Sequence, residues 1–398
     1  MGSDRARPLL AVGFWLPGSG FARVLRHIAV GVADGFDVHV IGIGYHGPVA
    51  RLGPATLHPS NPHGGDVFAA FGAAELAERL GARIVLLVND LWMLHSYMRT
   101  LPSLRDRTRI VAYVPLDGRI VSDRLLSPLG SVDRFVVPTE FARRELSSAQ
   151  SRVGMRPRVS VIPHAIDAGM FRPLAGGRPA ARRQLFGGDP SWRQASFIVL
   201  NANRPLERKR IDLTIEGFAL FARDKPPGVK LWLHHAHMDA AERAGIESRI
   251  ACHRIADRVR LTERGAPPLS DTELGMVYNA CDVGLNTAMG EGWGLVSFEH
   301  AATGGAQVVP ASSACQELWD GAGELVPTED AGVPRFSPLA MRVVSAAGVA
   351  ASLERLYSDR RRLERMSQAA RENAARPKYR PDAVGAEWRT LFDEVSAQ

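Results

Sequence analysis

Cysteine is scarce in this chain of 398 residues, which has only Cys252, Cys281 and Cys315. No two of them form a Cys-x-x-Cys pair, which argues against a disulfide framework, a redox pair and a cysteine-bound zinc site. No Asp-x-Asp pair occurs either, and no apolar run approaches the roughly 20 residues that a membrane-spanning helix needs. We therefore expect a protein of a reducing compartment, the cytoplasm.

Lysine is rare as well: 49 residues are Lys or Arg, but the only lysines are Lys209, Lys225, Lys230 and Lys378. The formal net charge of +7 and the isoelectric point near 9.7 therefore depend on arginine, which favours bidentate contact with phosphates or carboxylates. The basic residues are dispersed, with no recognition helix and no interleaving of aromatic and basic residues. A nucleic-acid-binding protein is thus the weaker hypothesis, while contact with an anionic membrane surface stays open.

The composition is that of a well-packed protein, because 45% of the residues are hydrophobic and 23% are charged. The length predicts two or three globular units. The apolar run at residues 9–16 could be mistaken for a short signal peptide, but it has no small-x-small cleavage pattern. We interpret it as a first, buried β-strand.

Both halves of the chain alternate short apolar runs with longer amphipathic stretches, a pattern that indicates parallel strands joined by crossover helices. We therefore predict an α/β protein with two tandem, Rossmann-like, doubly wound domains, at residues 1–172 and 173–380. The segment 381–398 is predicted to be a terminal helix, packed either on its own domain or back on the first one. Two such domains usually bind their ligand at the carboxyl ends of the strands.

The most informative segment follows an apolar run at residues 281–285, where a glycine-bearing loop leads into a helix. Backbone N–H groups at that helix start would face an anion, and Gly292 and Gly294 would let a phosphate approach the main chain. Glu291 and Glu299 are separated by at most about 12 Å along a helix. That span suits two acceptors at the two ends of a nucleotide sugar, one at sugar hydroxyls and one at ribose hydroxyls.

Two further loops also follow predicted strands. The first contains Arg204, Arg208 and Lys209 at the start of a helix, where the helix dipole disfavours cations. An anion bound between them would relieve that conflict, although a solvated charge run is the alternative. The second, with Gly18 and Gly20, joins the first strand to the first helix and lacks the full dinucleotide fingerprint.

Together these segments resemble the retaining family-4 glycosyltransferases of GT-B fold. The most specific shared element is a Glu-x7-Glu motif, which here runs from Glu291 to Glu299 as EGWGLVSFE. The basic loop at 204–209, the linker at 163–173 and the run at 304–309 are also similar. The resemblance implies the GT-B fold and a nucleotide-sugar-dependent enzyme.

The resemblance also implies roles for individual residues of the second domain, which would bind the donor. Glu291 would touch the transferred sugar and Glu299 the ribose. Arg204 and Lys209 would hold the diphosphate. The other residues adjoining the nucleotide would be Gly292, Trp293, Gly294 and Leu295.

The first domain would bind the acceptor, with Gly18 and Gly20 lining the shared cleft. Here the sequence departs from the family, because members often have a His near the sugar where this chain has Asp117. The interval from the arginine to the lysine of the basic loop is also one residue shorter than in some members. Arg208 or Arg210 could therefore share the contact with the diphosphate.

Transfer of a sugar from a nucleotide diphosphate leaves negative charge on the departing phosphate, which the protein must neutralise. Because the chain has no Asp-x-Asp pair, we predict metal-independent transfer and no cofactor besides the nucleotide sugar. The resemblance implies retention of configuration by attack from the leaving-group side, and Asp117 is the candidate carboxylate for a covalent alternative. His234, His235 and His237 could ligate a metal, but a position over the donor cleft explains them more simply.

The leading hypothesis is thus a bacterial glycosyltransferase that moves a sugar from a UDP- or GDP-sugar to a small-molecule or glycan acceptor. The alternatives are a pseudo-glycosidic coupling enzyme or a phosphorylase-like enzyme of the same fold. The nucleotide base, the sugar, the acceptor and the oligomeric state stay open.

Overall fold

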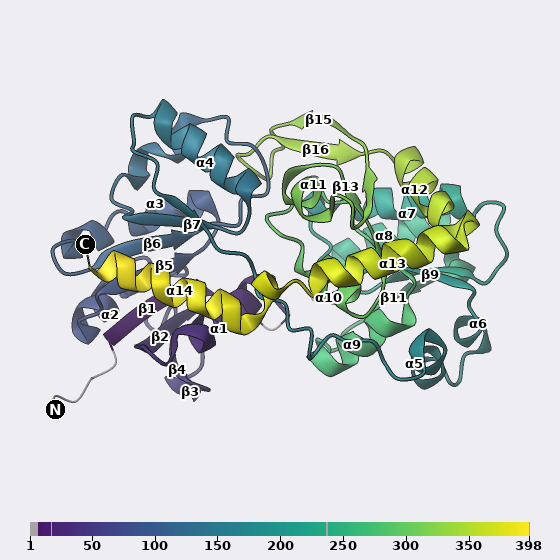
Figure 1. The fold of residues 1–398 in the computed structure, drawn as a ribbon, viewed down its shortest axis with the longest axis horizontal. Helices are drawn as coiled ribbons and strands as arrows, with labels where there is room; N and C mark the ends of the chain where they lie inside the picture. The colour runs from purple at the N-terminus through teal and green to yellow at the C-terminus, as the bar shows by residue number, and fades with distance from the viewer. Residues whose placement is uncertain (1–6, 17, 236–237, 398) are drawn as a thin grey trace. The chain divides into compact units, whose positions relative to one another are not determined.

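The structure, a computed structural model, describes residues 7–16, 18–235 and 238–397 (Figure 1). The chain forms two compact units, of which the first comprises Met1–Ala165 with Pro377–Gln398 and the second comprises Ile166–Arg376. The units meet in sequence at residues 165 and 166, a few residues before the predicted position at 172. The chain also returns to the first unit at residue 377.

The first unit is built on an eight-stranded sheet with the order β3-β4-β2-β1-β5-β6-β7-β8. Strands β3 and β4 pair antiparallel and the other neighbours pair parallel. The strands are β1 (Arg7–Phe14), β2 (Phe36–Ile43), β3 (Ala50–Leu52), β4 (Ala55–Pro59), β5 (Ile84–Val88), β6 (Arg109–Tyr113), β7 (Arg134–Val137) and β8 (Val159–Val161). The α-helices are α1 (Gly20–Val32), α2 (Gly72–Leu80), α3 (Leu94–Tyr97), α4 (Glu140–Arg152) and α14 (Pro381–Ser396).

The central strands of this sheet are covered on both faces and are therefore almost continuously apolar, as parallel sheets require. In β1, the residues from Leu9 to Val12 are at most 1% exposed. Helix α1 shows the complementary helical pattern, because Leu25, Ile28 and Val32 lie on its buried face. The apolar run near the N-terminus is thus a core strand, as the sequence predicts.

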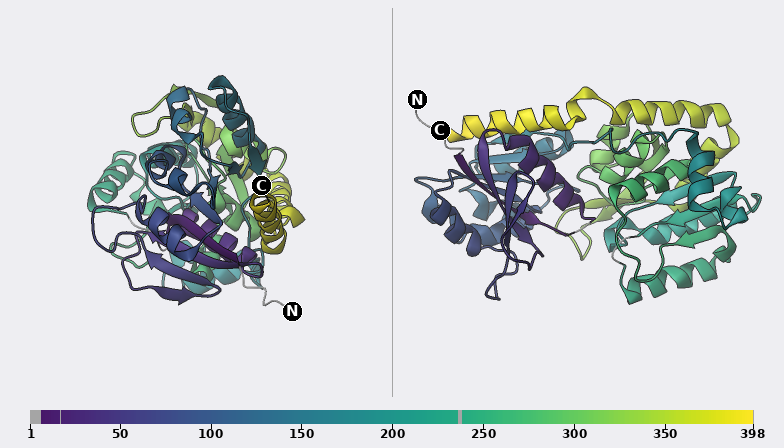
Figure 2. Two further views of the ribbon diagram at one scale, coloured as in Figure 1. Left: turned by 90° about the vertical axis from the view of Figure 1, so that its left-hand side faces the viewer. Right: turned by 90° about the horizontal axis from the view of Figure 1, so that it is seen from below.

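The C-terminal helix α14 packs along α1 of the first unit (Figure 2). Two glycines allow the close approach, since a Cβ atom on Gly31 would lie 2.8 Å from the Cα atom of Gly385. Further along α14, the ring of Trp388 packs edge-on against Tyr113, with 5.4 Å between the centroids. The sequence left open whether this helix packs on its own domain or on the first one, and in the structure it packs on the first unit.

The second unit contains a six-stranded parallel sheet with the order β11-β10-β9-β12-β13-β14 and an antiparallel pair, β15-β16. The strands are β9 (Phe197–Asn201), β10 (Val229–Leu233), β11 (Val259–Leu261), β12 (Val283–Leu285), β13 (Ala306–Pro310), β14 (Glu324–Val326), β15 (Thr328–Gly332) and β16 (Met341–Val344). The α-helices are α5 (Gly177–Leu185), α6 (Pro190–Arg193), α7 (Ile211–Ala222), α8 (Ala240–Cys252), α9 (Asp271–Ala280), α10 (Leu295–Ala302), α11 (Ser313–Trp319), α12 (Ala346–Ser358) and α13 (Arg360–Ala374). Both sheets confirm the predicted doubly wound α/β class.

The strand order of the second unit reverses between β9 and β12. From β9 the chain continues outward through β10 and β11, and then returns to β12 on the other side of β9 before it adds β13 and β14. In open α/β sheets, ligands bind outside the carboxyl ends of the strands at such a switch point. The loops that follow Asn201 and Leu285 are therefore the first place to look for a site. In the first unit, the corresponding reversal lies between β1 and β5.

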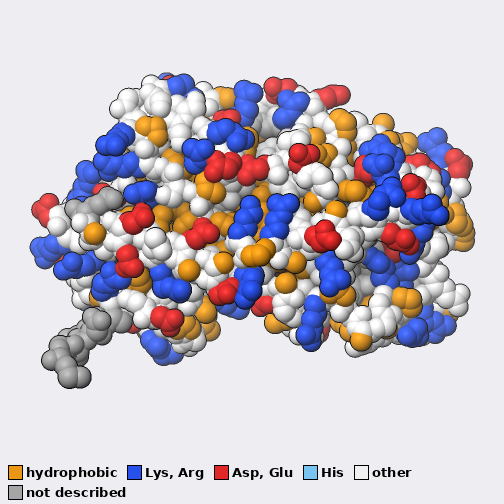
Figure 3. Space-filling view, in the orientation of Figure 1, with side chains coloured by type: hydrophobic (Ala, Val, Ile, Leu, Met, Phe, Trp, Pro, Cys, Tyr) orange, Lys and Arg blue, Asp and Glu red, His pale blue; other side chains and the backbone are white. Residues whose placement is uncertain are grey.

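Basic and acidic side chains are interspersed over each unit on the face that Figure 3 shows. This agrees with the dispersed charge of the sequence. Within the described part of the chain, no helix combines the length and the apolar character that a membrane span would need.

Candidate functional site

A buried ion pair joins the two loops at the switch point of the second unit. Lys209 ends the short 3₁₀ helix Glu207–Lys209 after β9, and its Nζ lies 2.5 Å from Oε1 of Glu291, in the loop after β12. The two residues are 9% and 5% exposed. Asn286 Nδ2 donates a second hydrogen bond to Oε1 of Glu291, at 2.9 Å. Arg208 adds a second cation, with Nη1 at 3.5 Å from Oε2.

These neighbours decide the charge of Glu291. Burial by itself would raise the pKa of this carboxyl, but the positive charges of Lys209 and Arg208 and the hydrogen bonds from Lys209 and Asn286 lower it to about 2. Glu291 is therefore a carboxylate at neutral pH. The cluster holds two cations and one anion, so it keeps a net positive charge.

The backbone of Glu291 is fixed by the start of α11, the helix that follows β13. Its N–H donates to Ser313 Oγ at 3.0 Å, and its carbonyl accepts from the N–H of Ala314 at 3.3 Å. Ser313 has φ of 47°, in the left-handed region that non-glycine residues rarely adopt. Ser313 could not be predicted from the sequence, because a Ser-Ser pair at the start of a helix carries no signal of such a role.

The start of α10 supplies backbone donors next to this cluster. Gly294 precedes the helix with φ of 93°, a conformation that requires glycine in practice. The amide groups of Gly292, Gly294 and Leu295 have no hydrogen-bond acceptor among the residues that the structure describes. Such a helix start can bind an anion.

Trp293 differs from its glycine neighbours because its side chain is only 2% exposed. Its ring stacks on Phe298 with 5.0 Å between the centroids, and Phe298 packs in turn against Trp319 at 4.8 Å. The indole therefore belongs to the core of the second unit. Any contact of this residue with a nucleotide would use its backbone.

Glu299, the second glutamate of the motif, lies in α10 and is 4% exposed. It accepts a hydrogen bond from the hydroxyl of Tyr278 in α9, at 2.9 Å. The ring of Tyr278 is itself held between Phe171 and His300, at 5.6 Å from each. Sequence reasoning did not identify Tyr278, because nothing in its local pattern separates it from a core tyrosine.

The arginines of the basic loop have three different positions. Arg204 is exposed, and no hydrogen bond or ion pair of its side chain is found among the described residues. Arg210 is engaged by Asp212, which accepts from its Nε and Nη2. Arg208 is the one that reaches Glu291, and its guanidinium also donates to the carbonyl of Gly290. The structure thus brings Lys209 and Arg208 to Glu291, but not Arg204.

The remaining predicted residues belong to the first unit. Gly18, with φ of 71°, lies in the loop after β1, and Gly20 is the first residue of α1. This loop follows one of the two strands at the switch point of the first sheet. Asp117 follows β6 and is 9% exposed.

The neighbouring histidines make contacts within the protein. The Nδ1 atom of His235 is 2.5 Å from the carbonyl oxygen of Asn203, and Nδ1 of His234 is 3.2 Å from Thr262 Oγ1. Burial lowers the pKa of each to about 4. His237 lies outside the described residues. Within the described ranges, no three His, Cys, Asp or Glu side chains are grouped so that they could hold a metal ion.

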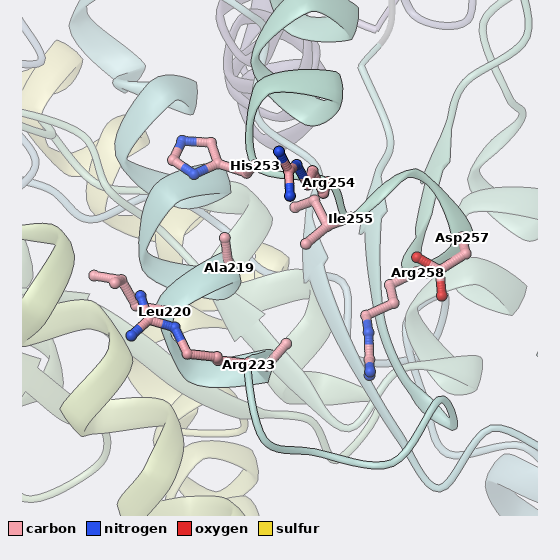
Figure 4. A pocket seen from close by; sticks show the side chains of 9 residues that line it. Ala219, Leu220, Arg223, His253, Arg254, Ile255, Asp257 and Arg258 are labelled. Carbon is pink, nitrogen blue, oxygen red and sulfur yellow. The ribbon is translucent and has the colours of Figure 1, made fainter.

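A hollow of about 370 Å³ elsewhere on the second unit does not contain any of these residues (Figure 4). It lies at the C-terminal ends of α7 and α8 and is lined by Ala219, Leu220, Ala222, Arg223, His253, Arg254, Ile255, Asp257 and Arg258. Cations at helix C-termini are stabilised by the helix dipole. The guanidinium of Arg258 also donates hydrogen bonds to the backbone carbonyls of Lys225 and Pro226. These arginines therefore have a structural explanation.

Comparison of the sequence with known proteins finds relatives that match part of the chain. No family model matches the chain. It is 30% identical over 172 residues to a D-inositol 3-phosphate glycosyltransferase of Segniliparus rotundus, a match that covers 43% of this chain and 35% of that protein. The enzyme of the same name from Mycolicibacterium smegmatis is 28% identical over 200 residues, which cover 48% and 42%. The matches thus span less than half of the length of these relatives.

Solved structures resemble the chain over almost its whole length. Sucrose-phosphate synthase of Thermosynechococcus elongatus has a TM-score of 0.76 at 17% identity, covering 98% of this chain and 99% of that one. Anabaena HepE, in complex with UDP and glucose, has a TM-score of 0.72 at 15% identity, covering 98% and 100%. A trehalose-phosphate synthase of Burkholderia xenovorans, in complex with glucose-6-phosphate, has a TM-score of 0.68 at 14% identity, with the same coverage.

These comparisons confirm the GT-B fold predicted from the sequence. They also confirm the resemblance to glycosyltransferases, since the sequence relatives carry that name and the structural neighbours include sugar-phosphate synthases.

Proposed function

We propose that the chain is a glycosyltransferase that moves a sugar from a nucleotide-diphosphate sugar, with UDP or GDP as the nucleotide, to an acceptor hydroxyl. The observation that carries this proposal is the cluster of Lys209, Arg208 and Glu291 beside the amide-rich start of α10, at the switch point of the second sheet. A buried lysine and a partly buried arginine, together with backbone amides that have no acceptor among the described residues, suit a diphosphate. A structural neighbour supports the same class of donor, because HepE was solved with UDP-glucose.

Lys209 and Glu291 both have hydrogen-bonding capacity left for a ligand. An ammonium has three hydrogens, and Lys209 donates to Glu291 and to Asn203, so one hydrogen remains for a phosphate oxygen. Oε1 of Glu291 accepts from Lys209 and Asn286, whereas Oε2 has one partner among the described residues, Arg208 at 3.5 Å. In this proposal Lys209 and Arg208 bind the diphosphate, and Oε2 of Glu291 accepts a hydrogen bond from a hydroxyl of the transferred sugar.

The roles of the other residues follow the same assignment. Glu299 accepts hydrogen bonds from the ribose hydroxyls. The hydrogen bond that Tyr278 donates to Glu299 holds this carboxylate in place. The amides of Gly292, Gly294 and Leu295 face the phosphates. Arg204 is exposed, and it contributes to donor binding only by a movement of its side chain toward the phosphates.

The proposed reaction needs no divalent ion, because fixed cations and amides stabilise the leaving group. The bond between C1 of the sugar and the phosphate oxygen breaks through an oxocarbenium-like state. The acceptor oxygen bonds to C1 from the same side, and its proton passes to the departing phosphate, so the configuration is retained. Asp117, with Gly18 and Gly20, belongs to the acceptor-binding unit, and Asp117 is the carboxylate to test for a covalent route.

A small phosphorylated polyol or sugar is the proposed acceptor. The curated relatives are named for D-inositol 3-phosphate, and one structural neighbour was solved with glucose-6-phosphate. Since both compounds are small and anionic, they suit a chain with a net charge of +7.

Calorimetric titration tests the proposal. Wild-type protein is titrated with UDP, GDP and their glucose conjugates, in buffer with EDTA and in buffer with magnesium. We expect micromolar to submillimolar binding of one nucleotide in both buffers, and weaker binding to the variant Glu299→Gln. The absence of binding of any nucleoside diphosphate, or binding only with magnesium, would contradict the proposal. Analysis of the product anomer by NMR then separates a retaining transferase from a pseudo-glycosidic coupling or phosphorylase-like enzyme.

A further inference from the structure

We infer that Thr287 positions Lys209 for the diphosphate, as part of a closed ring of buried hydrogen bonds; this inference rests on the proposed function. Thr287 lies in the loop after β12, and its Oγ1 is 2.9 Å from the carbonyl oxygens of both Lys209 and Arg210. On its other side, Oγ1 of Thr214 in α7 lies at 2.7 Å. Both threonines are 0% exposed. The ring therefore forms out of contact with water, where unpaired polar groups are costly.

In the first half of the ring, from Asn201 to the carbonyl of Lys209, the chemistry of the groups decides which one donates and which one accepts each hydrogen bond. A carbonyl only accepts, so the one hydroxyl hydrogen of Thr287 points toward the carbonyls of Lys209 and Arg210. Thr287 must then accept from Thr214. Thr214 accepts in turn from Nδ2 of Asn201, at 2.8 Å. The bonds run in one direction, from Asn201 through two threonines to the backbone of Lys209.

The second half of the ring leads from the side chain of Lys209 back to Asn201. The ammonium donates to Oδ1 of Asn203 at 3.3 Å. Asn203 donates through its backbone N–H and its Nδ2 to Oδ1 of Asn201, at 3.0 and 3.1 Å. The two asparagines are 0% and 5% exposed. Lys209 is thus held at both its carbonyl and its ammonium group.

This arrangement restricts a side chain that is otherwise flexible. The turn after Lys209 places Arg210 at φ of 48°, an unfavourable conformation for a residue with a side chain. Thr287 contacts the carbonyls on either side of that turn. Among the described residues, Thr287 is the one hydrogen-bond donor to the carbonyl oxygen of Lys209. Loss of its hydroxyl would free the turn, and the ammonium would no longer be preorganised for a phosphate.

The variant Thr287→Val tests the inference by removing the hydroxyl while keeping a branched side chain. Calorimetry compares the Kd for UDP with the Kd for uridine, which lacks the diphosphate. We expect a loss of about tenfold or more for UDP, as for a charge-assisted hydrogen bond, and less than twofold for uridine. Thr287→Ser should restore UDP binding. GDP and guanosine replace this pair if the wild type prefers guanine.

The matched control is Thr108→Val in the first unit. Thr108 is also buried, at 5% exposure, and donates to a backbone carbonyl, that of Ala82, at 2.8 Å. Its replacement should leave both affinities unchanged. If Thr287→Val does not fold, Asn203→Ala opens the ring at the ammonium and should show the same selective loss.

The possible results are distinct. UDP affinity that is unchanged in the variant overturns the inference, and so do equal losses for UDP and uridine, because those indicate general damage to the site. A wild-type protein that binds neither nucleoside diphosphate contradicts the proposed function itself.

Discussion

Replacement of Lys209 by methionine should destabilise the second unit strongly at neutral pH. The substitution keeps an extended side chain but removes the cation beside Glu291, whose carboxylate lies 2.5 Å from Nζ and is 5% exposed. Removal of one partner of a buried ion pair leaves an uncompensated charge. The expected cost is about 3–5 kcal/mol in the free energy of unfolding.

The stability lost in this variant should depend on pH, because it depends on the charge of Glu291. In the wild type, burial opposes ionisation, but the two cations still lower the pKa of Glu291 from 4.5 to about 2. The carboxylate therefore contributes stability that is fully present above pH 4.5 and is lost as the pH falls toward 2. At about 1.4 kcal/mol for each pH unit between the two pKa values, this is about 3.5 kcal/mol. In the variant the pKa of Glu291 rises, so the deficit should shrink between pH 7 and pH 4.

Hydrogen exchange followed by mass spectrometry is the suitable assay, because peptides from Ile166–Arg376 report on the second unit alone. Lys225→Met is the matched control. Its ion pair with Glu354 has a similar length, 2.8 Å, but the glutamate side chain is 44% exposed, so a cost of at most about 1 kcal/mol is expected. Equal protection of the Lys209 variant and the wild type at pH 7, or a deficit that grows toward pH 4, would refute the reasoning.

Four further substitutions, the last of them a control, test other contacts. Ser313→Ala removes the acceptor of the Glu291 N–H while the left-handed backbone persists, so urea denaturation should show a loss of about 1 kcal/mol and calorimetry a weaker affinity for the nucleotide. Gly385→Ala would place a Cβ atom 2.9 Å from the Cα of Gly31; we expect a loss of about 1–3 kcal/mol and faster hydrogen exchange in α14, and unchanged exchange there would count against this packing. Arg208→Gln should weaken UDP binding by roughly tenfold. Arg210→Gln removes the hydrogen bonds to Asp212, not a contact with Glu291, and should change the Kd by less than twofold; equal effects would contradict the distinction between the two arginines.

Much of the architecture could be predicted from the sequence because its causes are local. Alternating apolar runs and amphipathic stretches specify buried parallel strands and their crossover helices. Glycine at position 294 marks the left-handed residue before α10. The spacing from Glu291 to Glu299 already places both in the loop and helix after one strand. These features depend on neighbours along the chain, so a linear pattern records them.

Other features depended on the tertiary structure alone. Lys209 and Glu291 are 82 residues apart and meet only because β9 and β12 are neighbours in the sheet. The sequence favoured Arg204 as the partner of Lys209, but the path of the loop directs Arg208 to Glu291 instead. Thr287 is indistinguishable from any loop threonine until two other segments close around it. A loop's backbone conformation decides which side chains turn inward, and that conformation is set by contacts between strands that only folding brings together.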